Sequence, residues 1–202
     1  MRVFVGITGA SGAPYARRLL EALAAGGCEV GLCASSAGIQ VLATELYDDA
    51  LLSRDEVLAR LVASSADAVT VIDPNDWHSL YASGSSRVDA YAICPCSSGT
   101  LGALASGMSE NLIHRAAAVA LKEERKLVLC PRETPLSAIQ LENMLTLRRA
   151  GATILPLEPG FYSKPSSIDD LVDFVVARVL DQVGFENGLS ERWGEESRDA
   201  RA

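Results

Sequence analysis

The chain has 202 residues, of which 49% are hydrophobic and 22% are charged, which is the length and composition of one globular domain with a substantial core. Its net charge of −8 and the lack of a basic run disfavour nucleic-acid binding. The sequence opens on a strand-like run instead of an export signal, and the longest uncharged stretch (90–109) is too polar and too broken by glycine and proline to span a membrane. Five cysteines in such a chain predict reduced thiols and a cytoplasmic location.

Short apolar runs rich in β-branched residues predict buried strands over 3–8, 29–34, 69–72, 89–94, 126–130 and 153–156. Apolar residues with helical spacing predict helices between them. The first helix ends at Gly26-Gly27, and the second follows Ser35-Ser36. Further helices are expected over 54–63, after Thr100, over 112–122, over 137–149 with Ala138, Leu141, Met144 and Leu145 on one face, and over 168–179.

This alternation of strands and helices predicts an α/β fold: a doubly wound, mostly parallel sheet with helices on both faces, of the Rossmann or flavodoxin-like kind. We expect residues 1–184 to form the domain and residues 185–202 to form a polar tail that is available for oligomer contacts. In such folds ligands bind where strands end at their carboxyl side. The loops that follow the strands are therefore the candidate sites.

Three of these loops have the residues that a phosphate site needs. Thr8-Gly9-Ala10-Ser11-Gly12 lets backbone N–H groups approach an anion, Ser35 follows the second strand, and Cys96-Ser97-Ser98-Gly99-Thr100 joins several hydroxyls to a helix start. Taken singly, the first is equally explained as a tight turn and Ser35 as a plain N-cap. Their convergence at one sheet edge favours a mononucleotide phosphate site.

Other side chains at strand ends are candidates for chemistry. Arg132-Glu133 follows the fifth strand directly, where ligands bind. Trp77 lies in a polar loop, where it either fills the core or offers a flat π-surface. Cys94 and Cys96 would share a face of an extended strand. A metal site there is disfavoured because neither histidine stands at ligand spacing, and packing of small thiols explains the pair better.

Several motifs, in order along nearly the whole chain, together resemble the flavin prenyltransferase family (UbiX/Pad1-like), the partners of prenyl-FMN-dependent decarboxylases. They are GITGASGA (6–13), NDW (75–77), ASGSS (82–86), CPCSSGTL (94–101), NLIHRAAAVALKE (111–123), PRETPLS (131–137), LENM (141–144), PGFY (159–162) and RWGE (192–195).

The resemblance implies two phosphorylated substrates, reduced FMN and dimethylallyl monophosphate. It implies that FMN contacts Gly9, Ala10, Ser11, Ser35, Ser97, Ser98, Gly99, Thr100 and Arg115. It also implies that the phosphate of the second substrate meets Lys122, Arg132, Tyr162 and Arg178. A cluster of these cations could hold the leaving phosphate without a metal ion, and no aspartate-rich metal motif is present.

The resemblance also implies the chemistry: the allyl carbon joins flavin N5, and a ring then closes at C6 to give prenylated FMN. Glu133 matches a glutamate implicated in proton handling, Glu45 matches a second acidic residue, and Ser11 is a third candidate. Trp77 would stabilise the allylic cation by roughly 1–2 kcal/mol. Either Glu133 or the departing phosphate is a suitable base for ring closure. The family implies a homododecamer with sites at subunit boundaries and a UbiD-like decarboxylase that receives the product.

Two other functions fit parts of the pattern. An FMN-dependent cysteine decarboxylase has a catalytic histidine after the second strand, but residues 35–45 contain none, and it has Asn in the loop that here reads PCSSGT (95–100). A non-catalytic FMN carrier would need neither Glu133 nor the residues that the resemblance assigns to the allyl phosphate. Both functions predict that no prenylated flavin forms.

Overall fold

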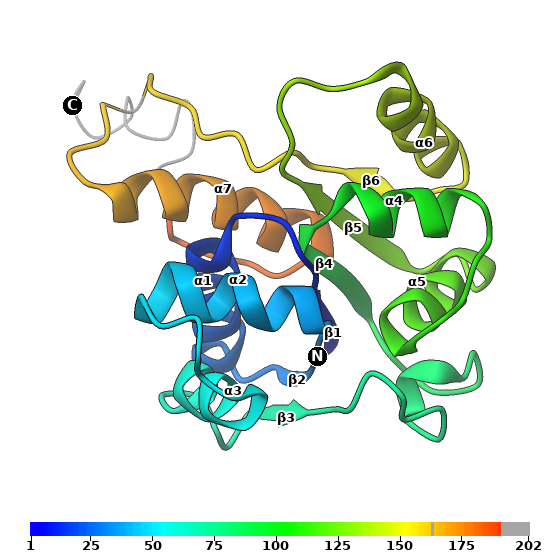
Figure 1. Ribbon diagram of the computed structural model, residues 1–202, viewed down its shortest axis with the longest axis horizontal. Helices are drawn as coiled ribbons and strands as arrows, with labels where there is room; N and C mark the ends of the chain where they lie inside the picture. The colour runs from blue at the N-terminus through cyan, green and yellow to red at the C-terminus, as the bar shows by residue number, and fades with distance from the viewer. Residues whose placement is uncertain (163, 191–202) are drawn as a thin grey trace, which may run out of the picture.

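A parallel β-sheet forms the centre of the protein (Figure 1). In the computed structural model, which describes residues 1–162 and 164–190, six strands lie in the order β3-β2-β1-β4-β5-β6, and every neighbouring pair is parallel. The prediction of a doubly wound sheet is confirmed. The strands are β1 (Arg2–Ile7), β2 (Glu29–Ala34), β3 (Val69–Val71), β4 (Ala90–Cys96), β5 (Lys126–Pro131) and β6 (Thr153–Ile154).

Helices connect these strands at the predicted places. Serine or asparagine caps most of their N-termini, so the sequence signals for helix starts are used in the structure. Over the described ranges the helices are α1 (Ala13–Ala25), α2 (Ser36–Tyr47), α3 (Arg54–Val62), the 3₁₀ turn η1 (Leu80–Ala82), α4 (Ser98–Ala105), α5 (Leu112–Lys122), α6 (Ala138–Arg149) and α7 (Ile168–Val183). None of the helices in these ranges has both the length and the apolar character that a bilayer crossing requires.

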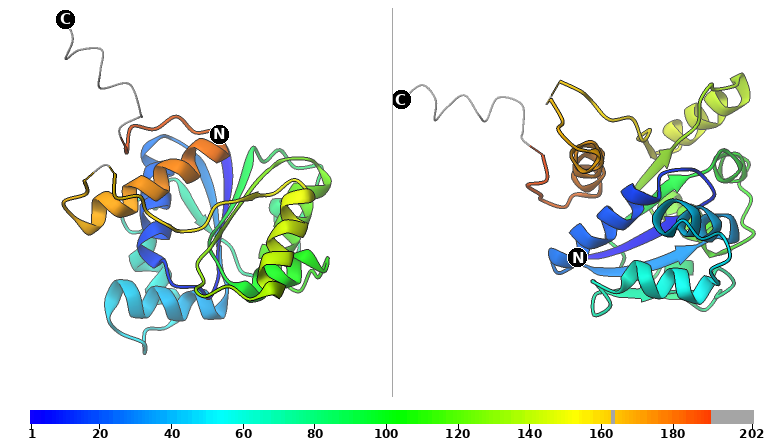
Figure 2. Two further views of the ribbon diagram at one scale, coloured as in Figure 1. Left: turned by 90° about the horizontal axis from the view of Figure 1, so that it is seen from above. Right: turned by 60° about the vertical axis from the view of Figure 1, so that its left-hand side comes forward.

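The core has two layers because successive strand residues point to opposite faces of the sheet. Val3 and Val5 of β1 belong to one cluster, which α1, α2, α3 and α7 cover, whereas Phe4 belongs to the other, which lies under α4 and α5. Figures 1 and 2 show these helices on the two sides of the strands. Phe185, at the start of the predicted tail, packs against Gly26 and the first cluster. Residues 191–202, with the RWGE motif, lie outside the described residues.

The prediction that Cys94 and Cys96 share a face is wrong. Cys94 packs in the cluster on the α1 side, with Cys130, whereas Cys96 packs in the cluster on the α4 side. The pairing of β4 with β5 shifts in register between Ile93 and Cys96, and this irregularity breaks the alternation of an extended strand.

The predicted apolar face of α6 is only partly covered. Leu147 is the buried residue of this helix, and Met144 lies partly buried against the core. Ile139, Leu141 and Leu145 remain 71%, 52% and 48% exposed. Figure 2 shows α6 standing out from the rest of the domain. Helical spacing therefore predicted the helix correctly but not which of its residues are buried within the chain.

We predict that Gly31→Ala destabilises the fold by about 1–3 kcal/mol, the usual range for overpacking a core. A methyl group at Gly31 would lie 2.2 Å from Cε2 of Tyr81, and that ring is buried against Phe4 with the ring centroids 5.1 Å apart. Urea denaturation measures the change in the free energy of unfolding. Gly188→Ala, with no atom within 4 Å of the new methyl group, is the control. Equal stability of the two variants would contradict the prediction.

Candidate active site

The candidate site lies at the carboxyl edge of the sheet, between β1 and β4, where the strand order reverses. Thr8 joins the two strands there. Its backbone N–H and its hydroxyl both donate to the carbonyl of Pro95, at 3.1 and 3.2 Å, and its Oγ1 accepts from the N–H of Ser97 at 2.8 Å. The loops after β1 and β4, which the sequence predicts to bind a phosphate, are therefore fixed to each other.

Glu45 closes the N-terminus of α1. Its Oε2 accepts from the backbone N–H groups of Gly12 and Ala13, at 2.9 and 2.8 Å, and Gly12 itself provides no side-chain cap. A carboxylate at this position also interacts favourably with the helix dipole. Glu45 thus lies beside the loop that follows β1, which the sequence predicts to bind the flavin. Its Oε2 is already hydrogen-bonded to the start of α1. Gly9 and Ser11 of that loop remain exposed.

The N-terminus of α4 faces the same edge. Ser97 is its N-cap and accepts from the N–H of Thr100 at 3.2 Å, and the two hydroxyls lie 3.0 Å apart. A Cβ at Gly99 would lie 4.0 Å from Ser97 Oγ, an ordinary van der Waals distance. An exposed glycine, hydroxyl groups and a helix N-terminus fit an anionic ligand such as a flavin phosphate. Ser35 caps α2 in the same way, by accepting from Gly38 N–H at 3.0 Å, so its structural role is confirmed and its ligand role stays a prediction.

Glu133 is hydrogen-bonded to the N-terminus of α4. Ser98 Oγ donates to Glu133 Oε2 at 2.9 Å, and this bond joins the loop after β4 to the residues that follow β5. Arg132 is exposed beside it. A cavity of about 280 Å³ lies against both residues, and its apolar lining includes Leu136, Met144 and Leu157. A guanidinium, a carboxylate and an apolar wall thus meet in one small space.

Trp77 stands in the loop after β3, on the α5 side of this edge. The backbone of that loop is held by Asp73, which accepts from Asn75 N–H at 2.7 Å, and by a bond from Leu112 N–H to the Pro74 carbonyl at 2.7 Å. Trp77 is 47% exposed, so filling the core does not explain it. An indole with this exposure has surface available to a flat ligand or a cation.

Arg115 and Lys122 lie along α5 and face the ASGSS segment (82–86). Arg115 Nε donates to the Ala82 carbonyl at 2.9 Å, one turn into the helix. Lys122, the last residue of α5, forms an ion pair with Glu123 and lies against Gly84. The ASGSS segment therefore lies alongside α5 and extends from near its first turn to its last residue, away from the carboxyl edge of the sheet.

The predicted cluster of Lys122, Arg132, Tyr162 and Arg178 is divided within one chain, because Lys122 lies far from Arg132. Lys122 comes just before β5 and Arg132 just after it, so the six-residue strand separates them by about 20 Å. Arg178 lies in the second half of α7, and the last residue of that helix, Val183, accepts at its carbonyl from Lys126 at the start of β5. Tyr162 is 66% exposed and packs edge-on against Phe174, with the ring centroids 5.5 Å apart.

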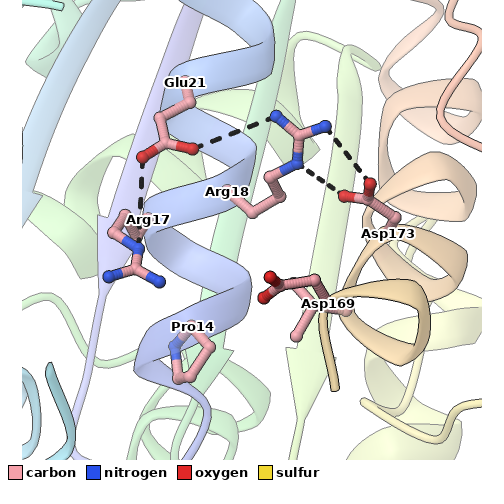
Figure 3. Close-up of a pocket in the computed structure, with 7 residues that line it drawn as sticks. Pro14, Arg17, Arg18, Glu21, Asp169 and Asp173 are labelled. Carbon is pink, nitrogen blue, oxygen red and sulfur yellow. Dashed lines mark hydrogen bonds and ion pairs between the residues drawn. The ribbon is translucent and has the colours of Figure 1, made fainter. Parts of the chain in front are cut away.

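A second cleft, between α1 and α7, has a volume of about 310 Å³ (Figure 3). Its arginines are already paired with carboxylates. Arg18 bonds Asp173 through two nitrogens, at 2.5 and 3.2 Å, and Arg17 lies 4.0 Å from Glu21. These pairs leave the cleft poorly suited to a phosphate.

The cysteines are buried in the described structure. Burial raises the pKa of the Cys33 thiol to about 12, and burial also raises the pKa of Cys96 well above its ordinary value. Such thiols stay protonated and are poor metal ligands. Within residues 1–162 and 164–190, no three His, Cys, Asp or Glu side chains gather in a way that could hold a metal ion.

Sequence reasoning placed Thr8 in the first candidate loop but gave it no role, although it makes three of the hydrogen bonds at this edge. The signal was available: a hydroxyl residue at the end of an apolar strand, before a glycine-rich turn, has to find buried hydrogen-bond partners. The structure brings together the loop after β1, the helix start after β4 and Glu133, but keeps Lys122 at the opposite edge.

Known proteins resemble this chain over most of its length. The Flavoprotein family model matches residues 1–180. The flavin prenyltransferase UbiX of Pseudomonas aeruginosa is 50% identical over 199 residues, which are 96% of this chain and 95% of that protein. The crystal structure of AnUbiX (PadA1) in complex with FMN and dimethylallyl pyrophosphate has a TM-score of 0.83 and 42% identity, over 95% of this chain and 96% of that one. A dodecameric FMN-dependent UbiX-like decarboxylase from Escherichia coli O157:H7 has a TM-score of 0.84 and 43% identity, over 96% and 99%.

We predict that Glu45→Ala lowers the free energy of unfolding by about 0.5–2 kcal/mol, because it leaves two N–H groups of α1 uncapped. Glu45→Gln keeps an acceptor oxygen and should lose less. Guanidinium denaturation gives both values, and Glu186→Ala, an exposed carboxylate near the end of the described chain, controls for the loss of charge. An alanine variant as stable as the wild type would remove this capping role.

Proposed function

Because this chain belongs to the flavin prenyltransferase (UbiX) family of flavoproteins, we propose that it transfers a dimethylallyl group from dimethylallyl monophosphate to reduced FMN, at N5 and C6 of the ring. The observation that supports this most is the hydrogen bond from Ser98 to Glu133. It joins the N-terminus of α4, one of the predicted flavin-binding segments, to a carboxylate at the wall of a cavity of about 280 Å³. That cavity is also lined by a cation and by apolar side chains. A carrier of FMN would need no such arrangement.

Each part of this edge has a role in the proposal. The loop at Gly9–Ser11 and the N-terminus of α4 hold the flavin phosphate and ribityl chain, and Ser35 adds a contact from α2. The bound flavin supplies the nucleophilic ring atoms. Arg132 attracts the leaving phosphate, and the apolar wall of Leu136 and Leu157 suits the five-carbon chain. The exposed face of Trp77 stabilises the allylic cation.

Glu133 handles protons in this scheme. It lines the same cavity as Arg132, the proposed phosphate-binding cation, so a carboxylate there can take up the proton lost at C6 or pass it to the departing phosphate. Ser11 and Glu45 complete the set of catalytic candidates, and Glu45 acts from a position fixed by its two bonds to α1. No metal ion is required in this scheme, because a monophosphate leaving group can be neutralised by side-chain cations.

The remaining cations are proposed to come from neighbouring chains of a homo-oligomer, as large as a dodecamer. Lys122 lies at the amino edge of its own sheet, about 20 Å from its own Arg132, and Arg178 lies in the second half of α7, where it pairs with Asp181. Arg115 and Tyr162 are also proposed to lie at subunit boundaries. The product passes to a UbiD-like decarboxylase, and the buried, unpaired thiols suit the predicted cytoplasmic location.

The direct test is anaerobic incubation of the protein with reduced FMN and dimethylallyl monophosphate. We expect mass spectrometry to find a flavin that is heavier by one C5 unit. Parallel reactions with the diphosphate decide which phosphate ester is the substrate. Glu133→Gln should retain FMN and lower kcat by about 10²–10⁴-fold, the usual contribution of a general acid or base. If stoichiometric wild-type enzyme yields no adduct, the FMN-carrier and cysteine-decarboxylase alternatives replace this proposal.

Complementation between two inactive variants tests whether Lys122 of one chain and Arg132 of another serve the same active site. We expect Lys122→Ala and Arg132→Ala homo-oligomers each to be nearly inactive. Mixed oligomers should regain activity at about a quarter of the sites, those where an intact Arg132 meets an intact Lys122 across a boundary. Mixtures of either variant with the double variant serve as the control. Recovery no greater than in that control would mean that the two residues do not serve one site from different chains.

A further inference from the structure

A chain of hydrogen bonds runs from the start of α6 to the Glu133 carboxylate. The backbone N–H of Ser137 donates to Gln140 Oε1 at 2.7 Å, and Gln140 Nε2 donates to Ser98 Oγ at 3.0 Å. Ser98 Oγ in turn donates to Glu133 Oε2 at 2.9 Å. Three elements, α6, α4 and the residues after β5, thus meet through one amide side chain.

The direction of this chain is fixed by its first member. A backbone N–H can only donate, so the oxygen of the Gln140 amide must face Ser137 and its NH₂ group must face Ser98. The NH₂ group also can only donate, which makes Ser98 Oγ an acceptor from Gln140. The single proton of the Ser98 hydroxyl is then directed to Glu133.

Gln140 is itself held in place by the capping box of α6. Ser137 Oγ accepts from the Gln140 N–H at 3.3 Å, while the Gln140 side chain accepts from the Ser137 N–H. The other oxygen of Glu133 accepts from the neighbouring Thr134 N–H at 3.3 Å. Both carboxylate oxygens are therefore oriented, one by the local backbone and one by Gln140 through Ser98.

We infer that Gln140 is a positioning residue for Glu133: it forces Ser98 to donate its proton to the carboxylate and so fixes the orientation of the proton-handling group. This inference rests on the proposed function. The inference also has a consequence for the predicted flavin site at the start of α4. If the Ser98 hydroxyl donates to Glu133, Ser98 can donate to a bound phosphate only through its backbone N–H.

Three variants separate this role from a structural one. Gln140→Glu keeps the shape and the acceptor for Ser137, which preserves the capping box, but replaces the donor to Ser98 by an acceptor. Gln140→Met removes both the donor and the acceptor without adding a charge. Ser137→Ala is the matched control, since it removes the N-cap hydroxyl and leaves the backbone N–H that holds the Gln140 oxygen.

We expect both Gln140 variants to lower kcat for prenyl transfer by about tenfold, the equivalent of one charge-assisted hydrogen bond, with the KM values of FMN and of dimethylallyl phosphate nearly unchanged. Ser137→Ala should keep the wild-type kcat. Thermal unfolding of all three reports any loss of fold. Wild-type kcat in Gln140→Glu, or an equal loss of kcat in Ser137→Ala, would overturn the inference.

A crystal structure of Gln140→Glu without substrates tests the same inference independently of turnover. We expect the bond between Ser98 Oγ and Glu133 Oε2 to be lost and the Glu133 side chain to adopt a different or a split orientation. An unchanged 2.9 Å bond would overturn the inference. If wild-type enzyme forms no prenylated flavin, the proposed function fails, and this structural readout still decides whether Gln140 orients Glu133.

Discussion

The bridge made by Thr8 between the ends of β1 and β4 is the constraint on which the rest of the site depends. Thr8 is 3% exposed, so its hydroxyl has no access to water and must be satisfied by the protein. It is satisfied by one bond in each direction, to the Pro95 carbonyl and from the Ser97 N–H. Both candidate anion-binding loops begin within a few residues of this bridge, and neither could shift without breaking it.

The distribution of charge in this acidic protein bears on the two phosphorylated ligands that we propose for it. Within one chain, Lys122 is paired with Glu123 and Arg178 with Asp181, and each of these cations is about half exposed. Exposed pairs of this kind contribute little to stability, so exchanging a carboxylate for a phosphate costs little. Arg132 instead lies beside Glu133 at the carboxyl edge. Local placement, and not net charge, makes anion binding possible.

The sequence was sufficient for the architecture, because apolar runs and capping serines mark the strands and helix starts directly. It also contained the separation of Lys122 from Arg132, since a strand predicted over 126–130 must place its flanking residues at opposite edges. The opposite faces of Cys94 and Cys96 were not predictable, because they depend on a register shift between two strands. The role of Gln140 depends on the contact of α6 with α4, which no local pattern indicates.

The exposed apolar side of α6 implies that this helix is less stable locally than the sheet. A helix that buries little of its own surface opens at low free energy, and its amides exchange early with solvent. The amide side chain that orients Glu133 is anchored on the first turn of this helix. Fraying of that turn would release the carboxylate while the sheet stays intact. The ordering of Glu133 is therefore tied to whatever covers Ile139, Leu141 and Leu145.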